Sequence, residues 1–233
     1  MAGKSADRTA RVDIISIGTL SRNRLWEETV AIRTPHSTCT LIRVGDRSIL
    51  VDPGLPPQII AARLAERTGL LPEKIDTVFL TNFRPSHRGG VAAFGRADFF
   101  IHEHERASAR RQLEALLDDA PEADLDRTVL EAELKLLSRC KPAEDKLAPN
   151  VDLFPLFGFT PGTCGLLVSS PTSTLMIAGD AIPTREHLLA GQVLPESQNI
   201  EAAQESMREV YEIADLIVPG HDNWFANPRH LGL

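Results

Sequence analysis

The chain has 233 residues, of which 42% are hydrophobic and 24% charged, and its formal net charge is −7. This length allows one large domain or two small ones, and the composition is typical of a globular protein that buries a sizeable core. A modest negative charge without a basic block argues against a nucleic-acid-binding face, which needs clustered lysine and arginine.

The N-terminal residues and the cysteines bear on the cellular compartment. Residues 1–11 are polar and lack the apolar stretch of a secretory signal, and no apolar run is long enough to span a membrane. Cys39, Cys140 and Cys164 lie far apart, and an odd, sparse set of cysteines favours reduced thiols over a disulfide framework. We therefore expect a cytoplasmic protein without membrane contact.

The first half of the chain predicts short strands followed by a helix. Alternating and apolar runs indicate strands at 12–17, 29–33, 38–44 and 48–51. Residues 57–68 predict a helix, because Pro57 suits the first helical position and Gly69 suits the end. Two further apolar runs predict strands at 77–80 and 99–102.

In residues 105–140 the sequence pattern changes from that of short strands to that of helices. Leu113, Leu116 and Leu117 have helical spacing, Pro121 interrupts the run, and a second amphipathic helix follows. We expect a helical insertion at about 105–140 between two halves of a single domain that covers residues 1–233.

Strands return after residue 151, and a helix is expected at 200–214 with Asn199 as its N-cap. Strands and helices thus occur in two similar blocks. This order favours an α/β fold of the αββα sandwich type, with two mixed sheets face to face and helices outside.

Chemically distinctive residues follow several of the expected strands. The strand at 77–80 is followed by Thr81-Asn82-Phe83-Arg84-Pro85-Ser86-His87-Arg88-Gly89-Gly90. Four other segments have the same character, an apolar run or turn with Gly, Pro, Asp or His: residues 48–54, 160–165, 174–180 and 216–221.

In content and order, these segments resemble the metallo-β-lactamase superfamily. In that family the first motif reads Thr-His-x-His-x-Asp-His, often followed by Gly-Gly, and a later turn reads Thr-Pro-Gly-His-Thr-x-Gly. The resemblance implies the same αββα sandwich, with metal ligands at strand ends. It also implies that the helical insertion either covers the pocket or packs on the sandwich or a partner subunit.

The resemblance further implies that most of the family's two-metal centre is lost. Asn82, Arg84 and Ser86 stand at three of the four ligand positions of the first motif, and only His87 is kept. The turn at 160–165 is shorter and has Thr163 and Cys164 where the family has a ligand histidine nearby. Arginine has no lone pair to donate to a metal. We therefore expect no two-metal centre.

The resemblance leaves His87, Asp180 and His221 as ligands for one divalent metal at most, such as zinc, iron or manganese. A site without metal, in which these three side chains bond to one another, is the alternative. The pairing of Asp180 with Arg84 is expected, because the guanidinium would neutralise a buried carboxylate. Asp52 would orient the ligands without binding metal.

The remaining site assignments concern the pocket. We expect it to be lined by Asn82, Ser86, Thr163, Cys164, His36 and His187. Arg84 and Asp180 are the expected catalytic residues if the protein is an enzyme, which would then be a metal-dependent hydrolase of the superfamily.

Three functions remain open at the level of sequence. In the first, the protein has lost the hydrolase centre and binds a small anionic molecule with little or no activity. In the second, it is a mononuclear-metal hydrolase that uses Arg84 as an electrophilic clamp. In the third, it is the structural subunit of a homodimer.

Overall fold

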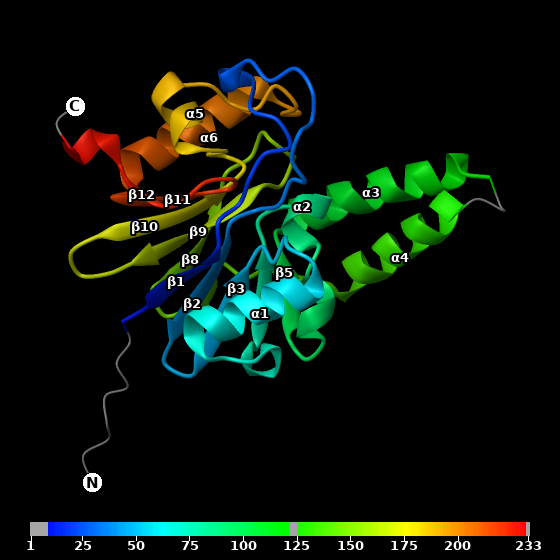
Figure 1. Ribbon diagram of the computed structural model, residues 1–233, viewed down its shortest axis with the longest axis horizontal. Coiled ribbons are helices and arrows are strands. Elements are labelled where there is room, and N and C mark those ends of the chain that lie inside the picture. Colours follow the sequence, from blue (N-terminus) through cyan, green and yellow to red (C-terminus); the bar gives the residue numbers. More distant parts are fainter. Residues whose placement is uncertain (1–8, 122–124, 232–233) are drawn as a thin grey trace, which may run out of the picture.

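The computed structural model describes residues 9–121 and 125–231, which form two six-stranded β-sheets facing each other with helices outside (Figure 1). This αββα sandwich confirms the fold expected from the sequence. The strand order is β1-β2-β3-β4-β5-β6 in the first sheet and β12-β11-β10-β9-β8-β7 in the second. Each half of the chain therefore builds one sheet.

The strands of the first sheet are β1 (Arg11–Ser16), β2 (Cys39–Val44), β3 (Arg47–Val51), β4 (Thr77–Leu80), β5 (Asp98–Ile101) and β6 (Cys140–Pro142). Those of the second sheet are β7 (Lys146–Ala148), β8 (Val151–Pro155), β9 (Cys164–Ser169), β10 (Thr174–Gly179), β11 (Leu216–Pro219) and β12 (Phe225–Ala226). The α-helices are α1 (Pro57–Thr68), α2 (Pro85–Arg88), α3 (Glu103–Asp119), α4 (Leu125–Arg139), α5 (Arg185–Ala190) and α6 (Ile200–Ile213). Short 3-10 turns occupy Arg24–Trp26, Pro72–Lys74, Val91–Phe94 and Pro228–Leu231.

Parallel pairing within each sheet brings polar residues together at strand ends. β3 pairs with β4 in parallel, and β10 pairs with β11 in parallel. Because parallel neighbours end at the same edge of a sheet, Asp52 and Asn82 follow adjacent strands of the first sheet. Asp180 and His221 follow adjacent strands of the second sheet in the same way.

Three apolar clusters hold the layers together. One lies between the sheets and includes Phe79, a second lies under α1, and a third lies under α5 and α6. The helices contribute Ile60 and Leu64 from α1, and Met207 and Val210 from α6. Full burial of one such side chain contributes about 1.5–3 kcal/mol to folding.

The helices α3 and α4 form a helical arm that projects from the sandwich (Figure 1). At its base, Glu105 and Leu137 are buried, whereas Leu116 and Val129 further out are more than half exposed. The base of the arm therefore belongs to the core of the domain, and its outer part does not.

The strand expected at 29–33 is absent, and this prediction was wrong. The segment is a loop in which the backbone N–H groups of Ile32 and Arg33 both donate to the carbonyl of Ser21. Val30 and Ile32 gave the strand-like alternation, but both remain about 60% exposed (63% and 60%). The alternation does not correspond to a buried face, so no sheet pairing stabilises it.

Close packing of α3 on the turn between β8 and β9 explains why residue 162 in that turn is glycine. A Cβ atom added to Gly162 would lie 2.0 Å from the backbone nitrogen of Glu105, too close for any real contact. Only glycine therefore lets the turn approach the first residues of α3.

We predict that Gly162→Ala lowers the free energy of unfolding by about 1–3 kcal/mol, because the helix or the turn must shift to admit the methyl group. Gly95→Ala is the matched control, since a Cβ there meets nothing within 4 Å. Urea unfolding of both variants is the measurement. Equal midpoints for the two variants would contradict the close approach.

Candidate metal centre and cavity

The candidate site lies where β4, β10 and β11 end. Asn82 follows β4, and His87 lies in the short helix α2, which Pro85 begins. Asp180 follows Gly179, which has a positive φ of 53° and lies so close to Thr81 that an added Cβ would meet its hydroxyl at 2.6 Å. The backbone of these turns therefore fixes the directions in which the side chains leave.

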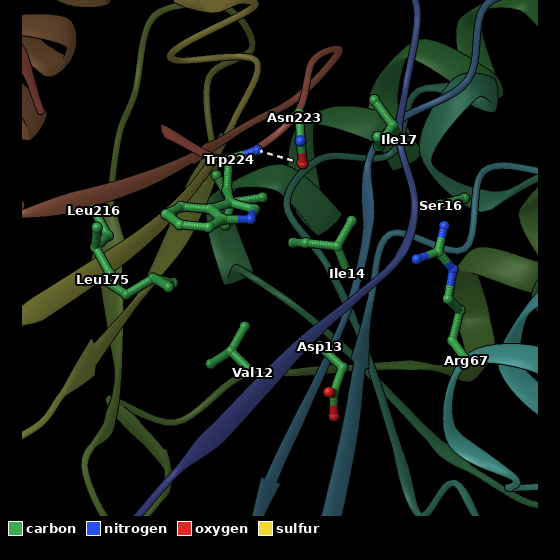
Figure 2. Close-up of a pocket in the computed structure, with 11 residues that line it drawn as sticks. Val12, Asp13, Ile14, Ser16, Ile17, Arg67, Leu175, Leu216, Asn223 and Trp224 are labelled. Atoms are coloured by element: carbon green, nitrogen blue, oxygen red, sulfur yellow. Dashed lines mark hydrogen bonds between the residues drawn. The ribbon is translucent and has the colours of Figure 1, made fainter. Parts of the chain in front are cut away.

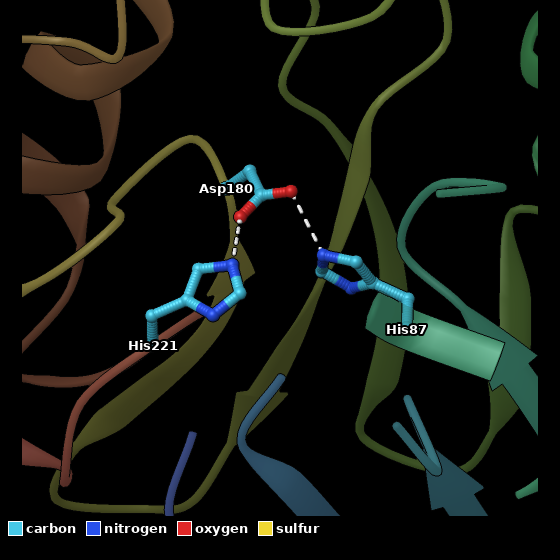
Figure 3. Close-up of side chains that lie close together, drawn as sticks. All are labelled: His87, Asp180 and His221. Carbon is cyan, nitrogen blue, oxygen red and sulfur yellow. Dashed lines mark hydrogen bonds and ion pairs between the residues drawn. The ribbon is translucent and has the colours of Figure 1, made fainter. Parts of the chain in front are cut away.

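His87, Asp180 and His221 converge, which confirms the expectation from the sequence (Figure 3). One potential ligand atom from each lies within 4.8 Å of the other two. Asp180 Oδ2 is 2.8 Å from His87 Nε2, and Asp180 Oδ1 is 2.9 Å from His221 Nε2. Among the described residues, no other group of three such side chains has this arrangement.

Both histidines use Nδ1 for a contact away from the centre. His221 Nδ1 lies 3.1 Å from the carbonyl of Thr19 and 3.0 Å from that of His36. His87 Nδ1 lies 2.9 Å from Asp52 Oδ2. Because these oxygens only accept hydrogen bonds, each Nδ1 carries a hydrogen. The Nε2 atom of each ring faces Asp180. When such a ring is neutral, its hydrogen is on Nδ1, and Nε2 has a lone pair that a metal ion could accept.

The charges at the centre compensate one another. Burial lowers the pKa of His87, but the charges of Asp180 and Asp52 outweigh burial and raise it to about 10. Burial raises the pKa of Asp180, while the charges of His87 and His221 outweigh that effect and hold it well below its usual value. The buried carboxylate is ionised and requires a positive partner, which is either a proton on an imidazole or a metal ion.

The donor set fits a divalent cation. Asp180 Oδ1 is buried and accepts no well-aligned hydrogen bond, although His221 Nε2 lies close to it. Two imidazole nitrogens with anchored Nδ1 atoms and one carboxylate are a common ligand set for zinc and iron. His87, Asp180 and His221 would hold the ion, and Asp52 would fix the orientation of His87.

Asn82 and Thr81 complete the polar network. Asn82 Nδ2 donates to Asp180 Oδ2 at 2.9 Å, and its Oδ1 accepts from the backbone of Arg84 at 2.9 Å. Thr81 donates its hydroxyl to Asp52 Oδ2 at 2.7 Å. Asn82 thus occupies the side of Asp180 where we expected Arg84.

The expected pair between Arg84 and Asp180 does not form. Arg84 is exposed, and its guanidinium lies 5.1 Å from the ring centroid of Phe159. The carboxylate already has Asn82 and two imidazoles around it. An outward Arg84 keeps its hydration, which a buried guanidinium would lose.

A cavity of about 540 Å³ borders the centre. Its lining combines three arginines, two acids, two histidines and an apolar surface: Leu20, Ser21, Arg22, Arg24, Ala31, Pro35, Arg84, Pro85, Ser86, Phe159, Asp180, His187, Leu194, Pro195, Glu196 and His221. Of the residues expected in the pocket, Ser86 and His187 line it, as do Arg84 and, from the centre, Asp180 and His221.

Four other expected pocket residues do not line this cavity. The Asn82 side chain donates a hydrogen bond to Asp180 and does not reach the cavity. The Thr163 hydroxyl accepts a hydrogen bond from the backbone N–H of Thr160 within the same turn. Cys164 is fully buried, and burial raises the pKa of its thiol far above the usual value. His36 contributes its backbone carbonyl to His221, while its ring bonds to the carbonyl of Ile17. Thr163 and Cys164 are both fully buried in the protein interior.

The role of Glu105 was not predicted from the sequence. This buried carboxylate accepts hydrogen bonds from the Phe83 backbone (2.9 Å), the Thr160 hydroxyl (2.6 Å) and the Gly162 backbone (3.2 Å). It thereby joins α3 to the motif after β4 and to the turn before β9. In the sequence it is one acid among many in a charged segment, so no local signal distinguishes it.

A second cavity of similar size, about 550 Å³, lies away from the centre (Figure 2). It runs between β1 and the strands β10 and β11, with Val12, Leu175, Leu216 and Trp224 in its wall. None of the three ligand candidates lines it. The two cavities are similar in size, but only the cavity of about 540 Å³ is lined by candidate metal ligands, Asp180 and His221.

The fold is an αββα sandwich with a candidate metal centre at its strand ends. The sequence profile described as the metallo-beta-lactamase superfamily matches residues 33–221, well over half of the chain. The chain therefore belongs to the metallo-β-lactamase superfamily. None of the curated proteins compared with it matches.

Solved structures with the same fold include hydrolases and lactonases. A Thermotoga maritima protein classed as a metallo-beta-lactamase has a TM-score of 0.67 at 18% identity, over 94% of this chain and 99% of that one. AidC, a dizinc quorum-quenching lactonase in complex with an acyl-homoserine product, has a TM-score of 0.66 at 19% identity, with coverages of 92% and 85%. AiiA of B. thuringiensis, with N-decanoyl-L-homoserine bound, has a TM-score of 0.61 at 18% identity, with coverages of 98% and 97%. At these identities the similarity shows the fold alone.

Within the described residues, no helix combines the length and the apolar character needed to cross a membrane.

We predict that Glu105→Ala lowers the free energy of unfolding by about 2–4 kcal/mol, because three buried donors lose their acceptor. Glu103→Ala is the matched control, an exposed acid in the same turn of α3 whose loss removes only a favourable interaction with the helix dipole, below about 1 kcal/mol. Urea unfolding compares the two. A loss for Glu105→Ala no larger than for Glu103→Ala would disprove the proposed link.

Proposed function

We propose that this protein has lost the two-metal hydrolase centre of its superfamily and binds a small anionic molecule in the cavity beside His87, Asp180 and His221, with little or no hydrolase activity. The single observation that carries the proposal is the ligand set. Among the described residues, only these three candidate ligands come together, which is enough for one metal and too few for two.

The charge of the cavity supports an anionic ligand. Arg22 and Arg24 lie 3.4 and 3.0 Å from Glu196, so their charges are partly compensated. In the part of the chain that the structure describes, Arg84 has no carboxylate within ion-pair distance. An uncompensated guanidinium at the cavity wall, with the apolar surface of Phe159 beneath it, suits a carboxylate or phosphate on an apolar body.

A mononuclear-metal hydrolase is the second candidate. The observation in its favour is the buried Asp180 Oδ1 together with two anchored histidines, which is a set ready for a metal ion. A bound divalent metal supplies Lewis acidity and lowers the pKa of bound water. The role of Arg84 would be to bind and orient the anionic or carbonyl oxygen of the substrate, and Asp52 would hold His87 in place.

We predict at most one zinc, iron or manganese ion per chain in protein purified without chelator. Saturating zinc should stabilise the fold by about 2.7 kcal/mol at a hundredfold excess over Kd, because the ion binds only the folded chain. Elemental analysis and thermal melts with and without zinc are the measurements.

In His221→Ala both the ion and the zinc effect should disappear, whereas His230→Ala, which lies outside the centre, should keep them. Two ions per chain would contradict the loss of the first metal site.

We predict that Arg84→Ala weakens binding of N-hexanoyl-L-homoserine, a carboxylate with an apolar chain, by roughly tenfold, which corresponds to about 1.4 kcal/mol. Its thermal midpoint should stay within error, because Arg84 is exposed and unpaired. Isothermal titration calorimetry is the measurement, and Arg96→Ala, an exposed arginine outside the cavity, is the control.

Hydrolysis separates the two candidates. The proposed binding protein should bind the probe and leave the corresponding lactone intact, with zinc present or absent. Zinc-dependent lactone opening that Arg84→Ala abolishes would instead establish the mononuclear hydrolase.

We also propose a cytoplasmic location. Its support is that Cys39, Cys140 and Cys164 are buried and unpaired. Titration of the unfolded, unreduced protein should find three free thiols, and fewer than three would contradict a reducing compartment.

A further inference from the structure

His187 lies at the border between the candidate metal centre and the cavity. It belongs to α5, which begins after Thr184, and it lines the same cavity as Asp180 and His221. The side chain is 3% exposed. It is therefore a buried polar group that neither the metal ligand set nor the fold accounts for.

Thr184 determines which ring nitrogen of His187 carries the hydrogen. The Thr184 hydroxyl accepts from the backbone N–H of His187 at 3.3 Å and lies 2.8 Å from Nδ1. If the hydroxyl donates its one hydrogen to Nδ1, every polar group in this turn is satisfied. If Nδ1 donated instead, the hydroxyl hydrogen would have no acceptor among the described residues. The satisfied arrangement places the ring hydrogen on Nε2.

The ring is neutral, so Nε2 is its only donor. Burial lowers the pKa of His187 by more than the charge of Glu186 raises it, and the smaller effects of His221 and Glu196 oppose each other. No protein atom in the described part of the chain bonds to Nε2, whereas Nδ1 is fully engaged. The edge that remains for the cavity is therefore a single N–H donor.

The backbone holds this donor in a fixed position relative to the centre. The carbonyl of Pro183 accepts from the His221 backbone at 2.8 Å, and that of Ile182 accepts from Gly220 at 3.0 Å. The segment that leads from Asp180 to α5 is thus bonded to the strand end that carries His221. A ligand oxygen bound at His187 would consequently have a defined position relative to all three ligand candidates.

We propose that His187 Nε2–H is a ligand-binding donor of this cavity, which takes the carbonyl or carboxylate oxygen of a small molecule whose apolar body lies on Phe159, Leu194 and Leu20. This proposal rests on the proposed function, since it assigns a residue to the same cavity. The Arg84 guanidinium attracts the negative charge of the ligand, and the His187 N–H fixes the position of its acceptor oxygen. A ligand without an acceptor oxygen would leave a nearly buried donor unpaired and should be rejected.

The tautomer is tested first, without any ligand. Nitrogen-15 NMR of the full chain at pH 7 distinguishes imidazoles protonated at Nε2 from those protonated at Nδ1. We expect His187 to be neutral with its hydrogen on Nε2, and Thr184→Ser to preserve this state because the hydroxyl remains. A hydrogen on Nδ1, or a charged ring, would overturn the proposal.

The ligand contact is tested by calorimetry with N-hexanoyl-L-homoserine. We expect His187→Phe, which keeps a flat ring without a donor, to bind roughly tenfold more weakly, the effect of one hydrogen bond to a charged group. His187→Gln, which restores an N–H, should recover part of the affinity. The control His104→Phe, an exposed ring outside the cavity, should bind as the wild type does.

The outcomes separate the two proposals. Unchanged binding by a folded His187→Phe would overturn the role of His187 and leave the anionic ligand of the proposed function in place. If the wild type does not bind the probe, the ligand class of the proposed function fails, and the tautomer measurement alone then decides whether His187 offers a donor to the cavity. A change in metal content in His187→Phe would show that His187 acts on the centre instead.

Discussion

The buried carboxylate of Asp180 is the constraint on which the rest of the site depends. It is ionised, almost inaccessible to water, and lies between two imidazoles, so its charge must be compensated within the protein. The backbone approaches the carboxylate closely, because a Cβ on Gly220 would lie 2.9 Å from Asp180 Oδ1. An anchored pair of histidines and a buried oxygen without an aligned donor together make this cluster the candidate metal site.

The helical arm stabilises the segment that carries this site. From α3, Glu105 accepts from the backbone of Phe83, and from α4, Glu133 pairs with Arg88, which in turn donates to the carbonyl of Phe83 at 2.9 Å. Two carboxylates of the arm therefore contact the segment between Asn82 and Arg88. Glu105 also joins this segment to the turn at 160–165 through its hydrogen bonds to Thr160 and Gly162.

The cavity differs from the centre in the kind of polarity it offers. At the centre, the buried Asp180 Oδ1 has lone pairs without an aligned donor, which suit a cation. The cavity instead offers hydrogen-bond donors, the guanidinium of Arg84 and the ring N–H that we assign to His187, and these suit oxygen acceptors of a ligand. A ligand with a carboxylate or carbonyl group would satisfy the cavity, whether or not an ion is bound at His87, Asp180 and His221.

The fold and the convergence of His87, Asp180 and His221 could be predicted from the sequence alone. Apolar runs that end in Gly, Asp or His mark strand ends, and parallel strands bring their ends together whatever the side chains between them are. The direction of Arg84, the inward position of Cys164, the loop at 29–33 and the link made by Glu105 became apparent only in the three-dimensional structure. These outcomes depend on contacts between residues far apart in the chain: Asn82 already satisfies Asp180, and Glu105 meets the Gly162 turn some 57 residues away. Local pattern specifies where a strand begins and ends, but hydration and charge, summed over the whole fold, determine where a polar side chain points.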